Sequence, residues 1–339
     1  MSMRKIILLL LIYCSIQPLY SKKTVIKLAT LAPDGSEWYY KLVELGEKWE
    51  EGTDGRVKLR IYPGGVIGDE RDMIRKMRIG QIHGAAITAE GLSELNPDFY
   101  MFFVPLLFEN YGEVDFIRGE LRDELISGIR SNGFELMMMT DVGWVYWFTT
   151  NSIKKPDDLK SSKIFNWAGD YKFSEIWEKA GFQSVPLSSI DILPGLQTGL
   201  IDAISINPQF SLANQMFGIC NHMLDLKWGL LTGGIVLDSR IFNRIDPKDR
   251  RIIQTYSKDF EEQFQKTFRF KDENAINVMK QYDLQVTHLN KDEKIIWNNA
   301  VKSWYPNIRN IFTNPEIFDK VVELKAKYKD HITGLDDTE

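Results

Sequence analysis

The sequence predicts an α/β protein with two lobes. Strand-like and helix-like segments alternate through the first part of the chain, and a similar succession returns after residue 134. The chain has 339 residues, 44% of them hydrophobic, which is enough to build two separate cores. Residues 249–282 contain no Gly or Pro and are predicted to form one long helix that braces both lobes.

The N-terminus has the pattern of an export signal. Arg4 and Lys5 precede an apolar run over residues 6–12, and small or polar residues follow as far as Ser21. The apolar run is far below the ~20 residues that a membrane-spanning helix needs. Residues 1–21 are therefore predicted to be a signal peptide cleaved after Ser21, with a retained, uncleaved anchor as the alternative.

The cysteines predict no disulfide in the mature chain. Cys14 lies within the signal, and the bulky Tyr13 stands where a lipoprotein signal needs a small residue, so lipidation at Cys14 is the less favoured interpretation. Cys220 then has no partner and is expected to be a buried, small apolar residue. The net charge of −5 comes from interspersed charges, without the basic stripe that a nucleic-acid partner would require.

The first part of the mature chain has the pattern of a parallel α/β sheet. Ile26 and Leu28 fall in an alternating strand, and Leu42, Leu45 and Trp49 lie at helical spacing in the segment that follows. The predicted order is strand 24–30, helix 37–51, strand 57–62, helix 69–79 and strand 84–88. The second part is predicted as strand segments at 134–140 and 144–150, a turn at 156–159, a strand at 163–167, a helix at 171–180, a short strand from 185 and a return to the sheet at 200–204.

The C-terminal third is predicted to be helical. Asp246 and Pro247 form a helix start, with Asp as the cap and Pro at the first helical position. Apolar residues then recur every four residues, and a helix of this length would span ~50 Å at ~1.5 Å per residue, which is more than one lobe. Two further helices are expected near 291–311 and 315–329.

The residue patterns that catalysis or metal binding needs are missing. The four histidines show no metal-ligand spacing, and no Gly-rich loop carries the Lys and Ser or Thr of a phosphate site. Carboxylates are plentiful, but no pair is marked out. We therefore predict a protein that is not an enzyme and that uses no cofactor and no metal.

Four short segments form a pattern that extends over most of the chain. They read IKLAT with PDGS at 26–36, GRVK with YPGG and IG at 55–68, PDDLK with KI at 156–164, and LQTGLIDA ending in NP at 196–208. In this order they resemble the DctP family of TRAP-transporter solute-binding proteins, and the similarity covers residues 24–330.

The resemblance implies a two-lobed periplasmic binding protein, type II-like, whose lobes are joined by crossing strands and a long bridging helix. Residues 24–145 with about 235–280 are assigned to lobe I, and about 146–234 with 281–339 to lobe II. The family implies a periplasmic receptor that closes around a small-molecule solute and delivers it to TRAP membrane permease subunits. An accessory periplasmic protein is a further candidate partner.

The chain departs from the family pattern at the carboxylate clamp. Family members usually place an Arg after the Lys-Ile of the strand at 163–167, and Phe165 stands there in this chain. A second basic residue of the preceding crossing strand is replaced by Tyr146. A buried carboxylate would lack its partner without these cations, so an acidic solute is disfavoured.

Aromatic side chains stand in place of the clamp. Tyr146, Phe165 and Trp167, with Trp144, are expected to form a wall for a hydrophobic, aromatic or uncharged solute. The alternative is that these rings fill the cleft and that the ligand contacts lie elsewhere. Alternate members of the aromatic run 144–148 should face the core, and the sequence leaves open which ones do.

Polar residues complete the predicted ligand-binding set. Asn207 matches the Asn that usually faces the solute in the family, and Glu90 follows the third strand, at the edge where α/β sheets place ligands. Asn166 and Phe210 are the remaining candidates. The alternative function is an exported interaction protein that kept the fold but lost solute binding.

Overall fold

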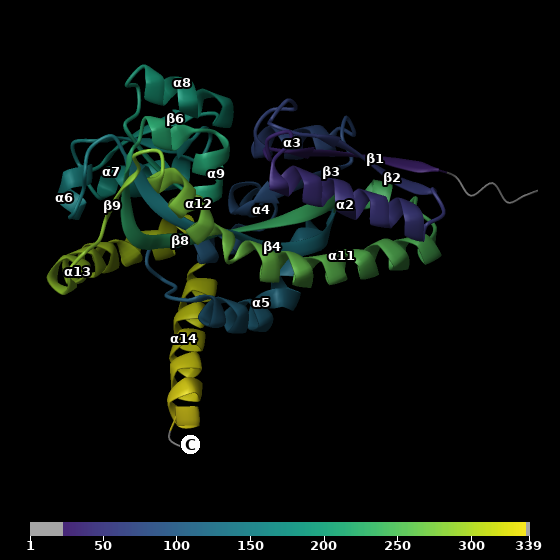
Figure 1. Ribbon diagram of the computed structural model, residues 1–339. Coiled ribbons are helices and arrows are strands. Elements are labelled where there is room, and N and C mark those ends of the chain that lie inside the picture. The colour runs from purple at the N-terminus through teal and green to yellow at the C-terminus, as the bar shows by residue number, and fades with distance from the viewer. Residues whose placement is uncertain (1–22, 337–339) are drawn as a thin grey trace, which may run out of the picture.

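Two lobes lie side by side in the computed structural model, which describes residues 23–336 (Figure 1). The predicted signal peptide, with Cys14, lies outside the described residues. The strands form one mixed sheet in the order β2-β1-β3-β8-β4-β7-β5-β6, and β9 pairs with β8. The two-lobed α/β architecture predicted from the sequence is confirmed.

The first lobe is built on three parallel strands, β1 (Thr24–Thr30), β2 (Val57–Tyr62) and β3 (Gly84–Thr88). Helices α2 (Glu37–Gly52) and α3 (Glu70–Arg78) connect them, as predicted. Ser36 caps α2 by accepting a hydrogen bond from Tyr39 N, and the apolar face of α2 is buried through Leu45 and Trp49. The helices α4 (Ala89–Leu95), η1 (Pro97–Phe103) and α5 (Tyr111–Ser131) then lead toward the second lobe.

Two long antiparallel strands, β4 (Phe134–Thr149) and β8 (His222–Asp238), run through both lobes. The sequence predicted β4 as two segments, and it did not reveal β8. Glycines at 229, 233 and 234 interrupt the apolar pattern of β8, which makes the strand hard to recognise in the sequence. Glycine is needed there because neighbouring backbone or side-chain atoms occupy the space of a Cβ.

The second lobe carries β5 (Lys163–Trp167), β6 (Gln183–Leu187) and β7 (Ala203–Ile206), with β5 parallel to both others. Helix α7 (Tyr171–Lys179) connects β5 to β6, and β9 (Gln285–Thr287) adds to β8. The remaining short elements are α6 (Pro156–Leu159), η2 (Ser189–Asp191), α8 (Ile192–Gln197), α9 (Pro208–Ala213), η3 (Met216–Gly218) and α10 (Ser239–Phe242).

The predicted single helix over 249–282 is divided into α11 (Pro247–Phe268) and α12 (Lys271–Lys280). Arg269 leaves the helix at the joint, and its guanidinium reaches Asp141 at 2.8 Å and Asp115 at 2.7 Å while lying over the Tyr111 ring. These ion pairs favour a turn at the joint, although the sequence has no Gly or Pro there to predict one. Helix α11 packs on β4 and α2, and α12 packs on α9, so the two helices together bridge the lobes.

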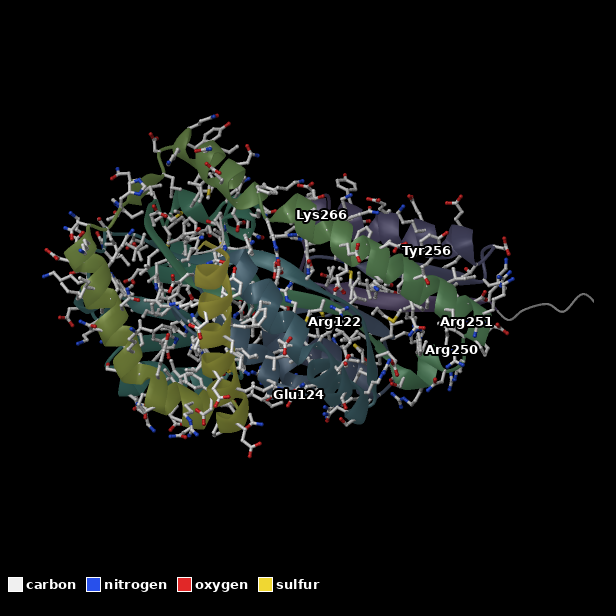
Figure 2. The ribbon with its side chains drawn as sticks, turned by 90° about the horizontal axis from the view of Figure 1, so that it is seen from below. Arg122, Glu124, Arg250, Arg251, Tyr256 and Lys266 are labelled. Carbon is white, nitrogen blue, oxygen red and sulfur yellow. The ribbon has the colours of Figure 1, made fainter. Side chains whose placement is uncertain are left out.

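Helix α11 is fixed to the crossing strand by a buried carboxylate. Glu261 accepts hydrogen bonds from Met139 N at 2.9 Å and from Arg122 of α5 at 2.6 Å. Arg122 lies beside α11 in Figure 2, whereas Arg251 and Lys266 extend from its exposed face. These contacts hold α5, α11 and β4 together as one unit.

The chain ends in α13 (Lys291–Asn307), the short π-helical segment η4 (Ile308–Phe312) and α14 (Pro315–Asp336). Helix α14 packs against α5 and η1, although the sequence assigned it to lobe II and them to lobe I. The exact lobe boundaries stay a prediction. Within residues 23–336, no helix combines the length and the apolar character needed to cross a membrane.

Candidate binding site

A cavity of about 1030 Å³, including its open mouth, lies where the two lobes meet the crossing strands. The first lobe contributes the turn after β1 and the end of β3, and the second lobe contributes the ends of β5 and β7. Side chains of β4 and β8 form the wall between them. A molecule held here would touch both lobes at once.

Aromatic rings cover much of the cavity wall. Phe260 and Phe264 come from successive turns of α11, because residues four apart share one face of a helix. Trp38 of α2 lies next to them and stacks on Phe268 with ring centroids 6.3 Å apart. The aromatic side chains of the lining are Trp38, Phe103, Trp167, Phe210, Phe260 and Phe264.

The charged member of the described lining is Glu70, and neither Lys, Arg nor His contributes to that lining. Glu70 Oε1 accepts from Thr88 N at 2.9 Å, and Oε2 accepts from Thr88 Oγ1 at 3.0 Å and Gly91 N at 2.8 Å. Burial raises the pKa of Glu70 to about 7. The three hydrogen bonds hold both Glu70 oxygens against the turn that leads into α4, at the positive end of that helix.

Three neutral polar side chains of the lining differ in how their atoms are used. Thr30 Oγ1 accepts from Ala32 N at 3.2 Å, and Asn207 Nδ2 donates to Val142 O at 3.2 Å. Thr140 is buried, but its Oγ1 forms no hydrogen bond within the described part of the chain. A buried hydroxyl without a partner is costly, so the Thr140 hydroxyl should lower the stability of the fold.

Of the residues predicted from the sequence, Trp167, Asn207 and Phe210 come together in this lining. Trp167 ends β5, while Asn207 precedes α9 and Phe210 lies in its first turn. These residues follow parallel strands at the same edge of the sheet, which is where open α/β sheets bind ligands.

Trp144 and Tyr146 lie outside this lining, because a bulge changes which face of β4 each residue presents. Val142 is an extra residue between the pairs Asp141–Thr232 and Gly143–Leu231. Before the bulge Met138, Thr140 and Val142 line the cavity, and after it Val145 does. Trp144 instead packs on Tyr111 with ring centroids 5.4 Å apart, and Tyr146 is buried in the core.

Phe165 and Asn166 support the site from behind and are not part of the lining. Phe165 is buried and meets Trp167 edge-on at 5.0 Å between ring centroids. Asn166 Nδ2 donates to Asp170 O at 2.9 Å and Ser174 Oγ at 2.8 Å, which ties β5 to the start of α7. The position that Phe165 occupies is therefore filled by a packed ring.

Glu90 also lies outside the lining, although it directly follows β3. Its carboxylate accepts from Arg71 Nε at 2.7 Å and lies 3.0 Å from the Tyr100 hydroxyl. The end of β3 turns directly into α4, so the side chain that faces the cavity there is Thr88.

The residues of α2, β8 and α11 that line the cavity were not among those predicted from the sequence. The four-residue period of α11 identified Phe260 and Phe264 as one face, but that face packs equally well on a core. Gly233 and Gly234 could not be found because β8 itself was not predicted.

Comparisons with known proteins agree with this architecture. The family described as bacterial extracellular solute-binding protein, family 7 (DctP) matches residues 28–310. A solute-binding protein of Roseobacter denitrificans is 24% identical over 189 residues, 54% of this chain and 56% of that relative, so this chain spans little more than half its length. The C4-dicarboxylate-binding protein DctB of Bacillus subtilis is 20% identical over 286 residues, 81% of this chain and 79% of that protein.

The fold has a solved counterpart. The sugar acid binding protein of Advenella mimigardefordensis, crystallised with galactonate, superposes with a TM-score of 0.84 at 16% identity. The superposition covers 91% of this chain and 99% of that structure. At this identity the likeness concerns the fold.

Proposed function

The chain belongs to the bacterial extracellular solute-binding proteins of family 7, which are receptors and not enzymes, and we propose that it is the periplasmic receptor of a TRAP-type transporter for a small solute without negative charge. The observation that carries the proposal is an interlobe cavity whose described lining contains a carboxylate but no cationic side chain. The solute would bridge the lobes, and the closed form would then deliver it to the membrane permease.

The charge of the cavity argues against an acidic solute. Galactonate and C4-dicarboxylates, the ligands named for two of the relatives, are acids. A carboxylate buried in this cavity would find no guanidinium in the described lining to pair with. The aromatic walls instead favour a hydrophobic, aromatic or uncharged solute.

The cavity also distinguishes this function from its competitor. An interaction protein that had lost solute binding should have filled its pocket with side chains. The open, largely aromatic-lined space between the lobes supports solute binding instead.

Native mass spectrometry of the mature chain purified from its expression host tests the proposal, followed by denaturing extraction of any bound molecule. We expect a neutral or apolar molecule in the parent chain and its loss in Trp167→Leu. Phe165→Leu is the matched control, because Phe165 contacts Trp167 but does not line the cavity. A molecule lost equally from both variants would show that Trp167 has no direct role.

A thermal-shift panel tests the solute class. Galactonate and succinate should leave the melting temperature unchanged. A neutral solute should raise it, because binding adds RT ln(1 + [L]/Kd) to the free energy of unfolding. Binding of either acid at micromolar affinity or better would contradict the proposed class while leaving the receptor function intact.

A further inference from the structure

Outside the cavity the lobes touch along a second set of contacts, which we call the seam: Asp69, Arg71, Glu90 and Tyr100 of the first lobe against Asp170 and Ser189 of the second. Asp69 accepts a hydrogen bond from Ser189 N at 3.1 Å. Asp170 caps α7 by accepting from Phe173 N at 3.0 Å and also reaches Tyr100. The seam can form only when the lobes are together.

Tyr100 joins two carboxylates that belong to different lobes. Its hydroxyl oxygen lies 3.0 Å from Glu90 Oε2 and 3.1 Å from Asp170 Oδ2. A phenol has a single proton, so it can donate to one of these oxygens but not to both. The second contact becomes a hydrogen bond only if one of the carboxyl groups carries a proton and donates it.

The surrounding charges point the same way. Arg71 pairs with Glu90 and also with the more exposed Glu94, so one guanidinium faces Glu90, Glu94 and Asp170. Glu70 on α3 adds a further negative charge close to Glu90. Burial raises the pKa of Glu90 to about 8, with repulsion from Asp170 as the second cause, and burial raises the pKa of Asp170 as well.

We propose that closing the lobes takes up one proton from solvent, held between Glu90, Tyr100 and Asp170, so that acid favours the closed form and alkali opens it. Opening moves Asp170 away from Tyr100, returns water to both carboxyl groups and releases the proton. The proposal rests on the seam alone and holds whatever the solute is.

The size of the effect follows from proton linkage. A proton that binds more tightly to the closed form stabilises that form at low pH, and the advantage is lost as the pH rises through the pKa of the closed state. Exposed carboxyl groups titrate near pH 4, so the ratio of closed to open chains should fall up to about tenfold per pH unit between about pH 5 and about pH 8. The ratio should be constant above that window.

The distance between spin labels on the two lobes measures closure without a solute. Labels on Glu51→Cys in α2 and Glu178→Cys in α7 occupy exposed positions of opposite lobes, with Cys220→Ala in the background. In the ligand-free mature chain, we expect the population with the closed distance to grow as the pH is lowered from 9 to 5.5. Unchanged distances over this range would overturn the proposal.

Substitutions assign the effect to the seam. Asp170→Asn is neutral at every pH and can still cap α7, so it should remove the pH dependence and favour the closed distance; Glu90→Gln should behave alike. Asp69→Asn alters the seam away from the shared proton and should keep the pH dependence of the parent. If the closed population still depends on pH in both Asp170→Asn and Glu90→Gln, the proton lies elsewhere and the assignment is refuted.

Discussion

Thr140 and Thr30 line the same cavity, yet replacing each with Val should change stability in opposite directions. Both are buried, at 5% and 4% exposure, and Val has the shape and the strand preference of Thr. Thr140 Oγ1 has no hydrogen-bond partner in the described chain, whereas Thr30 Oγ1 accepts from Ala32 N. The pair therefore compares a buried hydroxyl without a partner with one that the fold uses.

The magnitudes follow from the cost of an unpaired polar group, about 1–3 kcal/mol when it is fully buried. Thr140→Val removes such a group, so the free energy of unfolding of the ligand-free chain should rise by about 1 kcal/mol. Thr30→Val leaves the half-buried Ala32 N–H without its acceptor, so stability should fall by about 1 kcal/mol.

Urea unfolding of the ligand-free mature chain, followed by tryptophan fluorescence, measures both changes. Equal slopes of the unfolding transition would show that the variants unfold the same surface as the parent. A loss of about 1 kcal/mol or more in Thr140→Val would refute the reasoning, because that hydroxyl would then have a partner inside the folded protein.

Three further changes test the walls and the hinge. Phe260→Ala should lower the free energy of unfolding by about 3–5 kcal/mol and enlarge the cavity, as measured by urea unfolding. Gly143→Ala should lower the melting temperature, because Gly143 has a φ of 138° and a Cβ there would lie 2.6 Å from Asp272 Oδ2. Burial raises the pKa of Asp272 to about 7, so the folded chain holds a proton that the unfolded chain releases above about pH 4. The free energy of unfolding should therefore fall as the pH rises through that window, and Asp272→Asn, compared at pH 5 and pH 8, should lose this slope.

The elements that the sequence predicted well are those whose local pattern agrees with their environment. Strands β1, β2, β3 and β5 and helices α2 and α3 carry regular periodicity and clear turn residues, and the structure places them within a residue or two of the prediction. The joint between α11 and α12 was missed because ion pairs of Arg269 with residues more than a hundred positions away produce it. No local pattern records such a contact.

The candidate site shows the same division. Trp167 was predicted from the aromatic wall and Asn207 from the resemblance to the family, and both line the cavity with Phe210, whereas Glu90, predicted from its place at the strand edge, does not. Trp144 and Tyr146 could not be assigned to a face, since a one-residue bulge at Val142 exchanges the two faces of β4. Whichever face of β4 is turned to the cavity, the described lining contains no cationic side chain, and the class of solute stays a prediction.

The cavity and the seam are made of different residues, so the choice of solute and the closing of the lobes can change independently. Few polar groups line the cavity, so the proposed function requires most of the affinity to come from apolar contact with rings such as Trp38 and Trp167. Charged groups that join the lobes lie instead at the seam, where Arg71, Glu90 and Asp170 meet through Tyr100. Changes in the cavity should therefore alter which solute is bound, whereas changes in the seam should alter how readily the lobes close around any solute.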